Sequence, residues 1–330
     1  MAEELLRVQD LRTCFTVRGK VVPAVDGISF SINSKESIGI VGESGCGKSV
    51  TSLSIIRLIY PPGEIETGEI YFEGTDLLKK SQSYMRNIRG NDIAMIFQEP
   101  MTSLNPVLDL KTQITETIIK HKEIKLKAAT ENAIELLRAV GIPNPEIRIK
   151  EYPHQLSGGM RQRAMIAMAL SCNPKLLIAD EPTTALDVTI QAQILELLKN
   201  LRKRFGMSIM IISHDLGVIA EMSDIVLVMY AGKIVEKGSI RDVLNTPLHP
   251  YTKGLLGSIP KIEQKAKKLH VIEGNVPVPG EFSTGCRFHP RCNYMKEICK
   301  NFEPPDRLLP DGRQLKCWIG TEKYDRGVAS

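Results

Sequence analysis

The chain has 330 residues, of which 42% are hydrophobic and 25% are charged. These proportions are ordinary for a globular protein and exclude a disordered chain, a collagen and a coiled coil. No stretch approaches the roughly 20 apolar residues that cross a bilayer, and the net charge of +5 arises without a long basic run, so nucleic-acid binding is not demanded.

Acidic residues occupy the N-terminal segment MAEELLRVQD, where a signal peptide has a basic segment followed by an apolar one. We therefore expect the protein to stay in the cytoplasm. The chain up to about residue 40 alternates apolar and polar positions and is broken by Gly and Pro, which predicts antiparallel strands.

A phosphate-binding loop is predicted between an apolar strand at 37–41 and a helical pattern at 48–59. The motif G-x-x-x-x-G-K-[ST] is matched in full by Gly42, Glu43, Ser44, Gly45, Cys46, Gly47, Lys48 and Ser49. Its glycines let backbone N–H groups close around phosphate oxygens at the positive end of a helix dipole. Lys48 then reaches the β- and γ-phosphates, and Ser49 ligates Mg²⁺. Cys46 is interpreted as a small tolerated residue rather than a redox sensor.

Residues 112–140 are rich in helix formers, whereas the later segments LLIAD, SIMIIS and DIVLVMY are short apolar strands separated by helical patterns. This order predicts a parallel sheet with a helical insertion between its strands. The chain after about residue 251 is rich in Pro, Gly and Cys and is interpreted as a small appended domain.

The strand LLIAD ends in two carboxylates, Asp180 and Glu181, at the sheet edge where open α/β sheets place ligands. Asp180 suits the Mg²⁺ shell. Glu181 is placed to orient or deprotonate the attacking water, because phosphoryl transfer depends on positioning and charge stabilisation. Such a pair is usually only a solvated turn, but a complete phosphate loop upstream favours the functional interpretation.

A second anion-binding surface is predicted where Ser157, Gly158 and Gly159 lead into the helical pattern RAMIAMAL. The segment LSGGMRQR at 156–163 resembles the signature motif of ATP-binding cassette (ABC) ATPases, with Met160 at the usual glutamine position. Other ABC elements follow in family order: Phe15 resembles the aromatic residue that stacks on adenine, Gln98 the Q-loop glutamine, residues 184–187 the D-loop, and His214 the switch histidine.

This resemblance implies an ATPase that uses ATP and Mg²⁺ and works as a head-to-tail dimer. The phosphate loop of one subunit and the signature of the other then enclose each ATP. By the same resemblance, Gln98 takes part in the Mg²⁺ and water network and connects it to transmembrane subunits through the loop 99–106. His214 is expected to contact the γ-phosphate.

The loop FQEPMTSLNPV, the stretch HPYTKGLL at 249–256 and a four-cysteine C-terminal segment are similar to ATPase subunits of bacterial dipeptide and oligopeptide importers. The resemblance covers nearly the whole chain. It implies a second, different ATPase subunit, two transmembrane permeases and an external peptide-binding protein as partners. The protein is then expected at the cytoplasmic face of the cell membrane, hydrolysing ATP to drive peptide import.

The expected fold class is α/β, a P-loop NTPase of the ABC ATPase type. Its parallel-sheet core carries an N-terminal antiparallel β subdomain and a helical subdomain at about 100–170. We expect the nucleotide-binding domain to span residues 1–250 and a small cysteine-rich, metal-binding domain to span residues 251–330.

The C-terminal cysteines are spaced Cys286-x₅-Cys292-x₆-Cys299-x₁₇-Cys317. In a reducing cytosol they are interpreted as metal ligands rather than disulfides. Their spacing lacks the tight pairs of ordinary zinc sites and the spacing of common ferredoxins, so spacing alone does not choose between zinc and an iron–sulfur cluster. The family resemblance favours [4Fe–4S], with zinc next and unligated cysteines last. His289 is an alternative ligand that four thiols make unnecessary.

Two other functions compete with peptide import. An ABC ATPase for another solute, such as nickel or glutathione, fits the same residues, because solute choice resides mainly in the binding protein and the permeases. An ABC protein acting on nucleic acid or ribosomes ranks lower, because such proteins usually fuse two cassettes or insert long coiled coils.

Overall fold

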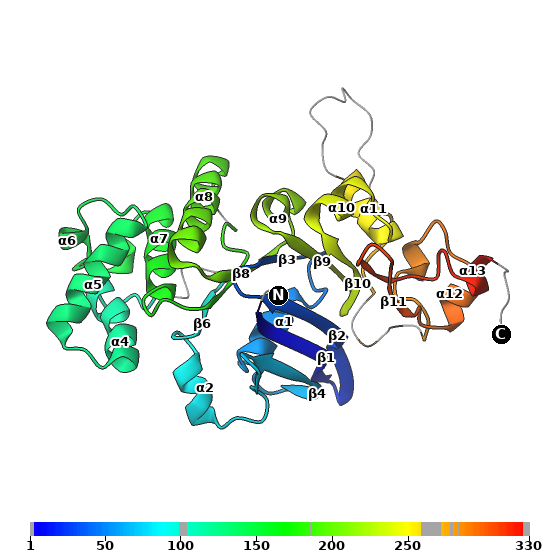
Figure 1. The fold of residues 1–330 in the computed structure, drawn as a ribbon, viewed down its shortest axis with the longest axis horizontal. Helices are drawn as coiled ribbons and strands as arrows, with labels where there is room; N and C mark the ends of the chain where they lie inside the picture. The colour runs from blue at the N-terminus through cyan, green and yellow to red at the C-terminus, as the bar shows by residue number, and fades with distance from the viewer. Residues whose placement is uncertain are drawn as a thin grey trace. The chain divides into compact units, whose positions relative to one another are not determined.

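The computed structural model describes residues 3–98, 104–184, 186–258, 272–277, 280, 282 and 284–325. The chain divides into two compact units. Unit 1 comprises Met1–Leu5, Ile32–Ser37 and Asp76–Ile212, and unit 2 comprises Leu6–Ser31, Ile38–Thr75 and Ser213–Ser330. Figure 1 labels the elements of both units.

Most of an antiparallel sheet with strand order β2-β1-β4-β5 lies in unit 2. Its strands are β1 (Glu4–Val17), β2 (Lys20–Asn33), β4 (Gly63–Phe72) and β5 (Thr75–Asp76). β1 and β4 run antiparallel, in a register that places Leu6 opposite Phe72 and Phe15 opposite Gly63. The alternating pattern up to about residue 40 thus predicted the strands β1 and β2 correctly, because one face of such a sheet is buried and the other is more exposed. The partner strand β4 was not predicted.

Unit 2 also carries a row of paired strands in the order β11-β12-β10-β9-β3. The strands are β3 (Ser37–Val41), β9 (Ile225–Tyr230), β10 (Lys233–Ser239), β11 (Asp306–Leu308) and β12 (Gln314–Lys316). β3 and β9 are parallel, whereas β10 is antiparallel to both β9 and β12. Two strands from near the end of the chain thus extend the sheet that leads into the phosphate loop.

The helices in the described part of unit 2 are mostly short. They are α1 (Lys48–Ile55), α9 (Leu216–Met222), α10 (Ile240–Asn245), α11 (Pro250–Gly257), α12 (Glu297–Asn301), α13 (Glu322–Asp325) and the 3₁₀ turn η2 (His289–Arg291). Helix α1 ends earlier than the predicted 59, because Arg57 adopts a left-handed conformation with φ of +53° that no α-helix can continue through. We call the described residues 284–325 the cysteine-rich tail.

Unit 1 carries the parallel strands β6 (Ile93–Ile96), β7 (Leu176–Asp180) and β8 (Ser208–Ser213), with β7 paired to both others. All residues of β7 and β8 are buried, which explains their uninterrupted apolar sequences, since parallel sheets are covered on both faces. The parallel strands predicted from these runs are confirmed.

In the part of unit 1 that the structure describes, the helical elements are α2 (Gln82–Ile88), α4 (Leu110–Lys122), α5 (Leu126–Ala139), α6 (Pro145–Arg148), η1 (Pro153–Gln155), α7 (Gly158–Ala169) and α8 (Val188–Phe205). Helices α4, α5 and α7 pack on one another and form one cluster with α6 (Figure 1). The predicted helix-rich region at 112–140 is thus confirmed as α4 and α5.

Side-chain caps fix where these helices start. Asp109 accepts a 2.8 Å hydrogen bond from Thr112 N at the start of α4, and Asp187 accepts one of 2.9 Å from Ile190 N at the start of α8. Each cap contributes about 1 kcal/mol. None of the helices in the described ranges is both long enough and apolar enough to cross a bilayer.

Candidate functional site

The phosphate loop joins β3 to α1, as predicted. A Cβ on Gly42 would lie 2.2 Å from the carbonyl oxygen of Met229, so only glycine fits where the strand gives way to the loop. Gly47 precedes α1 with φ of +103°, and a Cβ there would lie 2.4 Å from the carbonyl oxygen of Ala24. Two glycines of the motif are therefore required by close backbone approach.

The side chain of Lys48 folds back onto this loop. It is buried, and its Nζ donates hydrogen bonds to the carbonyl oxygens of Gly42 at 2.8 Å and Glu43 at 3.1 Å. Ser49 follows it in the first turn of α1. A cation and a hydroxyl thus stand beside the positive end of a helix, where phosphate oxygens bind favourably.

Cys46 is fully buried within the loop. Burial raises the pKa of its thiol, although the Lys48 ammonium opposes this shift. A neutral thiol reacts poorly with oxidants, so the structure supports the interpretation of Cys46 as a small packed residue.

Glu43 is held by two residues far along the chain. Its main-chain N–H donates to the phenol oxygen of Tyr251 at 2.9 Å, and its carboxylate pairs with Arg291 at 2.8 Å. Sequence reasoning noted Tyr251 only as part of a family stretch and missed Arg291. The HPY segment at 249–251 was the sequence feature that could have indicated this contact. No local pattern in the sequence connects that segment with the phosphate loop.

Two further predicted residues belong to unit 2. Phe15 lies on β1 opposite Gly63, where an added Cβ would come within 2.5 Å of the ring. His214 is exposed between β8 and α9. The following residue, Asp215, caps α9 through a 2.7 Å hydrogen bond from Gly217 N, which fixes the backbone next to the histidine.

In unit 1, the strand β7 ends at the buried Asp180, and Glu181 follows it. The Glu181 carboxylate accepts hydrogen bonds from Gln98 Nε2 at 3.1 Å and from Thr184 Oγ1 at 2.9 Å. Its backbone has φ of +46°, a left-handed conformation that costs a non-glycine residue about 1 kcal/mol. The structure thus brings two predicted catalytic residues, Gln98 and Glu181, into direct contact.

The signature segment forms the start of α7. Ser157 is the N-cap, and its hydroxyl accepts a 3.3 Å hydrogen bond from Met160 N. Ser157 and Gly158 are exposed. Apart from Gly158 itself, its two neighbours in the chain and the backbone of its own helix, no described atom lies within 4 Å of the place where a Cβ on Gly158 would stand. An exposed helix start without a side chain in the way can accept an anion from outside the unit.

Parts of two predicted elements lie outside the described residues. The loop 99–106 that follows Gln98 is described only from Leu104 onward, and the D-loop segment 184–187 is described except for Ala185. The other predicted site residues fall in the described ranges.

Comparison with known proteins supplies the decisive observation. Family models match at residues 25–184 (ABC transporter) and 235–299 (oligopeptide/dipeptide transporter, C-terminal region). The oligopeptide transport ATP-binding protein AppD of Bacillus subtilis is 52% identical, over 97% of this chain and 98% of its own. The dipeptide transport ATP-binding protein DppD of the same organism is 48% identical, over 99% and 98%.

The chain belongs to the oligopeptide/dipeptide family of ABC transporter ATP-binding proteins.

Solved structures agree with this family. A dimeric ATP-binding cassette, MJ0796, in a post-hydrolysis state bound to ADP and Pi has a TM-score of 0.65 and 25% identity, over 72% of this chain and 99% of that one. The cassette CbiO1 from Clostridium perfringens has a TM-score of 0.63. The predicted P-loop fold and the assignment as an ABC-type ATPase are therefore confirmed.

Four cysteines of the cysteine-rich tail line one cavity. Its lining includes Cys286, Cys292, Cys299, Cys317, His249, His289 and Trp318. All of the cysteines are free thiols. Burial raises the pKa of Cys286 to about 12 and that of Cys317 to about 11, and the neighbouring thiols add to both shifts. Within the described ranges, no three or more His, Cys, Asp or Glu side chains form a group that could hold a metal ion.

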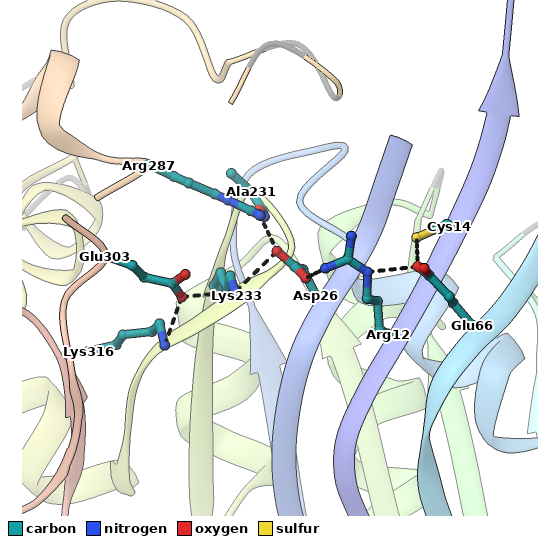
Figure 2. Close-up of polar contacts among 9 residues, drawn as sticks. All are labelled: Arg12, Cys14, Asp26, Glu66, Ala231, Lys233, Arg287, Glu303 and Lys316. Atoms are coloured by element: carbon teal, nitrogen blue, oxygen red, sulfur yellow. Dashed lines mark hydrogen bonds and ion pairs between the residues drawn. The ribbon is translucent and has the colours of Figure 1, made fainter. Parts of the chain in front are cut away.

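The cysteine-rich tail of this ABC protein is attached to the N-terminal sheet through Asp26 (Figure 2). Asp26 pairs with Arg12 at 2.7 Å, with Lys233 at 3.1 Å and with Arg287, which follows Cys286. Burial alone would raise the pKa of Asp26, but the nearby cations outweigh it and hold that pKa below its ordinary value. A second anion, Glu303, pairs with Lys233 at 2.9 Å. The network therefore joins both sheets of unit 2 to the tail.

Proposed function

We propose that this chain is the subunit that hydrolyses ATP to energise import of di- and oligopeptides through a membrane ABC transporter. The observation that carries the proposal is the full-length likeness to relatives named as oligopeptide and dipeptide transport ATP-binding proteins. The alternatives, another solute such as nickel or glutathione and a nucleic-acid or ribosome-associated role, are not favoured by these relatives.

The phosphate loop binds the nucleotide in this proposal. Backbone N–H groups of residues 42–49 and the ammonium of Lys48 take the phosphates, and Phe15 stacks on the adenine ring. Ser49, Gln98 and Asp180 serve the Mg²⁺ ion, which when bound neutralises charge on the phosphates. The buried Lys48 and its place between two loop carbonyls support this assignment.

Glu181 orients the attacking water and accepts its proton. The hydrogen bonds from Gln98 and Thr184 support this role, because they hold the carboxylate in one orientation without neutralising its charge. A base that is already oriented loses less entropy in the transition state. His214 contacts the γ-phosphate from the β8–α9 turn.

The signature residues Ser157, Gly158 and Gly159 act on ATP bound by a partner subunit. Their exposure at the start of α7 supports an intermolecular role. The partners are a second, different ABC ATPase, two transmembrane permeases and, indirectly, an extracytoplasmic peptide-binding protein. The protein then works at the cytoplasmic face of the cell membrane, with a nucleotide-binding domain at 1–250 and a C-terminal domain at 251–330.

The tail cysteines Cys286, Cys292, Cys299 and Cys317 hold a [4Fe–4S] cluster, with zinc as the alternative occupant. Their shared cavity supports this part of the proposal, because thiolate sulfur is the donor that both occupants prefer. When bound, either occupant cross-links the four cysteine segments. In the described arrangement these side chains do not form a group that could hold a metal ion, so binding either occupant requires them to rearrange.

Anaerobic purification followed by iron, sulfide and zinc analysis tests this occupant. Broad visible absorption with about four irons per chain supports the cluster. A colourless protein with stoichiometric zinc rejects the cluster, and a protein with neither metal rejects both occupants.

The ATPase role is tested with Glu181→Gln in the assembled ATPase pair. ATP binding is expected to stay within about twofold of wild type, while turnover falls by about 10²-fold or more. The glutamine side chain has the same shape as Glu181 but lacks the carboxylate that accepts the proton from water. Glu196→Gln, an exposed change on α8, is the matched control and leaves both unchanged. Unchanged steady-state hydrolysis in Glu181→Gln removes Glu181 from the role.

A further inference from the structure

The phosphate loop is held at Glu43 by two residues that the ATP motifs do not include. Tyr251, near the start of α11, is fully buried and accepts the 2.9 Å hydrogen bond from Glu43 N. The hydrogen bond is partly buried, and an N–H that is shielded from water is costly to leave without a partner. The phenol therefore fixes the peptide plane that enters the loop.

Arg291 holds the side chain of the same residue. Its side chain is only 6% exposed, and Nη1 lies 2.8 Å from the Glu43 carboxylate. Its other nitrogens donate to the carbonyl oxygens of Ile272 at 3.2 Å and Glu273 at 3.0 Å. Nη1 also contacts the Tyr230 hydroxyl at 3.5 Å. Because four partners fix the guanidinium, the Glu43 carboxylate is tied to a side chain that directly precedes Cys292 in the chain.

Aromatic packing supports both braces. The rings of Tyr230, Tyr251 and Phe288 contact one another, with centroid separations of 4.7, 5.1 and 5.4 Å. Tyr230 ends β9, and Phe288 lies in the cysteine-rich tail two residues after Cys286. Such rings offer little room for rearrangement in a close-packed interior.

A third connection uses the main chain. Gly232 N donates a 3.0 Å hydrogen bond to the carbonyl oxygen of Cys46 in the loop, and Arg287 donates to the carbonyl oxygen of Ala231 (Figure 2). Arg287 and Arg291 each stand next to a tail cysteine. The loop is thus contacted at Glu43 and at Cys46 by segments that residues of the tail hold in place.

We propose that Tyr251 and Arg291 are positioning residues for ATP binding: through Glu43 they hold the phosphate loop in the conformation that receives phosphates. This inference rests on the proposed ATP-binding function of the loop. A loop that is already ordered does not lose that conformational freedom when the nucleotide binds, so affinity depends on the braces. The cysteine-rich tail then contributes to nucleotide affinity without touching the nucleotide.

The test is nucleotide affinity of the full-length chain with a fluorescent ATP analogue. Tyr251→Phe keeps the ring packing and removes only the hydroxyl, and we expect affinity to fall about 3- to 10-fold, the effect of one hydrogen bond. Tyr71→Phe removes a phenol that donates to Glu69 on β4, away from the loop, and serves as the matched control with unchanged affinity.

A double-mutant cycle tests the ion pair. Glu43→Gln and Arg291→Gln are each expected to weaken affinity, and the double variant to lose less than the product of the two, because both remove one shared interaction. Arg291→Lys, which keeps the charge, is expected to recover part of the loss and guards against a variant that fails to fold. In the assembled ATPase, Tyr251→Phe and Arg291→Gln are expected to raise KM for ATP while kcat at saturating ATP stays unchanged.

Several results overturn the inference. Unchanged affinity in Tyr251→Phe contradicts it, as does a lowered melting temperature with unchanged affinity, which indicates a purely structural role. Lys48→Ala separates this failure from that of the proposed function. If Lys48→Ala abolishes ATP binding while Tyr251→Phe does not weaken it, only the bracing inference fails. If Lys48→Ala binds ATP like wild type, the proposed function fails as well.

Discussion

The main-chain N–H of Glu43 donates a hydrogen bond to the phenol oxygen of Tyr251, which lies 208 residues later in the chain. Glu43 belongs to the phosphate loop, and Tyr251 opens the region that follows the ATP motifs. This contact, together with the Arg291 ion pair, packs the loop directly against the family's C-terminal region. The stability of the loop therefore depends on residues outside the motif that defines it.

Gly42→Ala is expected to destabilise the protein by about 1–3 kcal/mol and to weaken ATP binding, because the new methyl group would overlap the Met229 carbonyl oxygen at the loop entrance. Urea unfolding and nucleotide titration measure the two effects. A variant with wild-type stability would show that the strand and loop separate more easily than the structure indicates.

Gly158→Ala makes the same change where there is space. We expect wild-type stability and wild-type ATP binding by this chain, since no described atom outside the local backbone and the two adjacent residues lies within 4 Å of the added methyl group. Hydrolysis in the assembled ATPase pair should fall at least about tenfold, because the methyl group obstructs the approach of the partner's nucleotide and removes stabilisation of the transition state. Full hydrolysis in the pair would exclude the signature from the intermolecular contact.

Removing the charge at Asp26 is expected to be costly. Asp26→Asn leaves Arg287 and Lys233 without their shared carboxylate, and we expect a loss of about 3 kcal/mol by urea unfolding. Glu66→Gln is the matched control, because Glu66 also pairs with Arg12 but lies in solvent. Exposed pairs contribute less than about 1 kcal/mol, so equal effects of the two changes would contradict the account of the network.

His249 predicts a loss of stability in mild acid. The ring is buried, its Nδ1 accepts from Tyr251 N, and burial lowers its pKa to about 3 from 6.5. Between pH 3 and pH 6.5, His249 is protonated in the unfolded chain and neutral in the folded chain. The free energy of unfolding contributed by this residue is therefore highest above pH 6.5 and falls by about 1.4 kcal/mol per pH unit below it.

His249→Asn keeps an acceptor for the Tyr251 N–H and cannot take up the proton. Urea unfolding at pH 7 and pH 5.5 should show that wild type loses about 1 kcal/mol more than the variant over this interval. Equal losses in the two proteins would mean that His249 is accessible to protons in the folded state.

Local patterns in the sequence were sufficient for the motifs. The phosphate loop can be predicted because its glycines, Lys48 and Ser49 are close together in the chain, between a strand and the start of a helix. The Asp180–Glu181 pair was recognised because it directly follows a buried parallel strand. In both cases the residues that act together are neighbours in the chain, so composition and spacing carry the information.

The bracing contacts could not be predicted in this way. Arg291 and Glu43 are 248 positions apart, and no periodic pattern connects them. The strands β11 and β12 have three residues each, too short for an alternating signal, and their pairing with β10 depends on the tertiary fold. The left-handed backbone of Glu181 could not be predicted either, because glutamate has no preference for a positive φ.

The most direct test of the central claim is uptake of labelled di- and oligopeptides by cells of the source organism whose chromosomal copy carries Glu181→Gln. The account predicts that peptide uptake is lost while uptake of free amino acids persists, and that Glu196→Gln cells transport both normally. Peptide uptake that continues at the wild-type rate in Glu181→Gln cells, with the variant protein present at normal abundance, would contradict the claim that ATP hydrolysis by this chain drives peptide import.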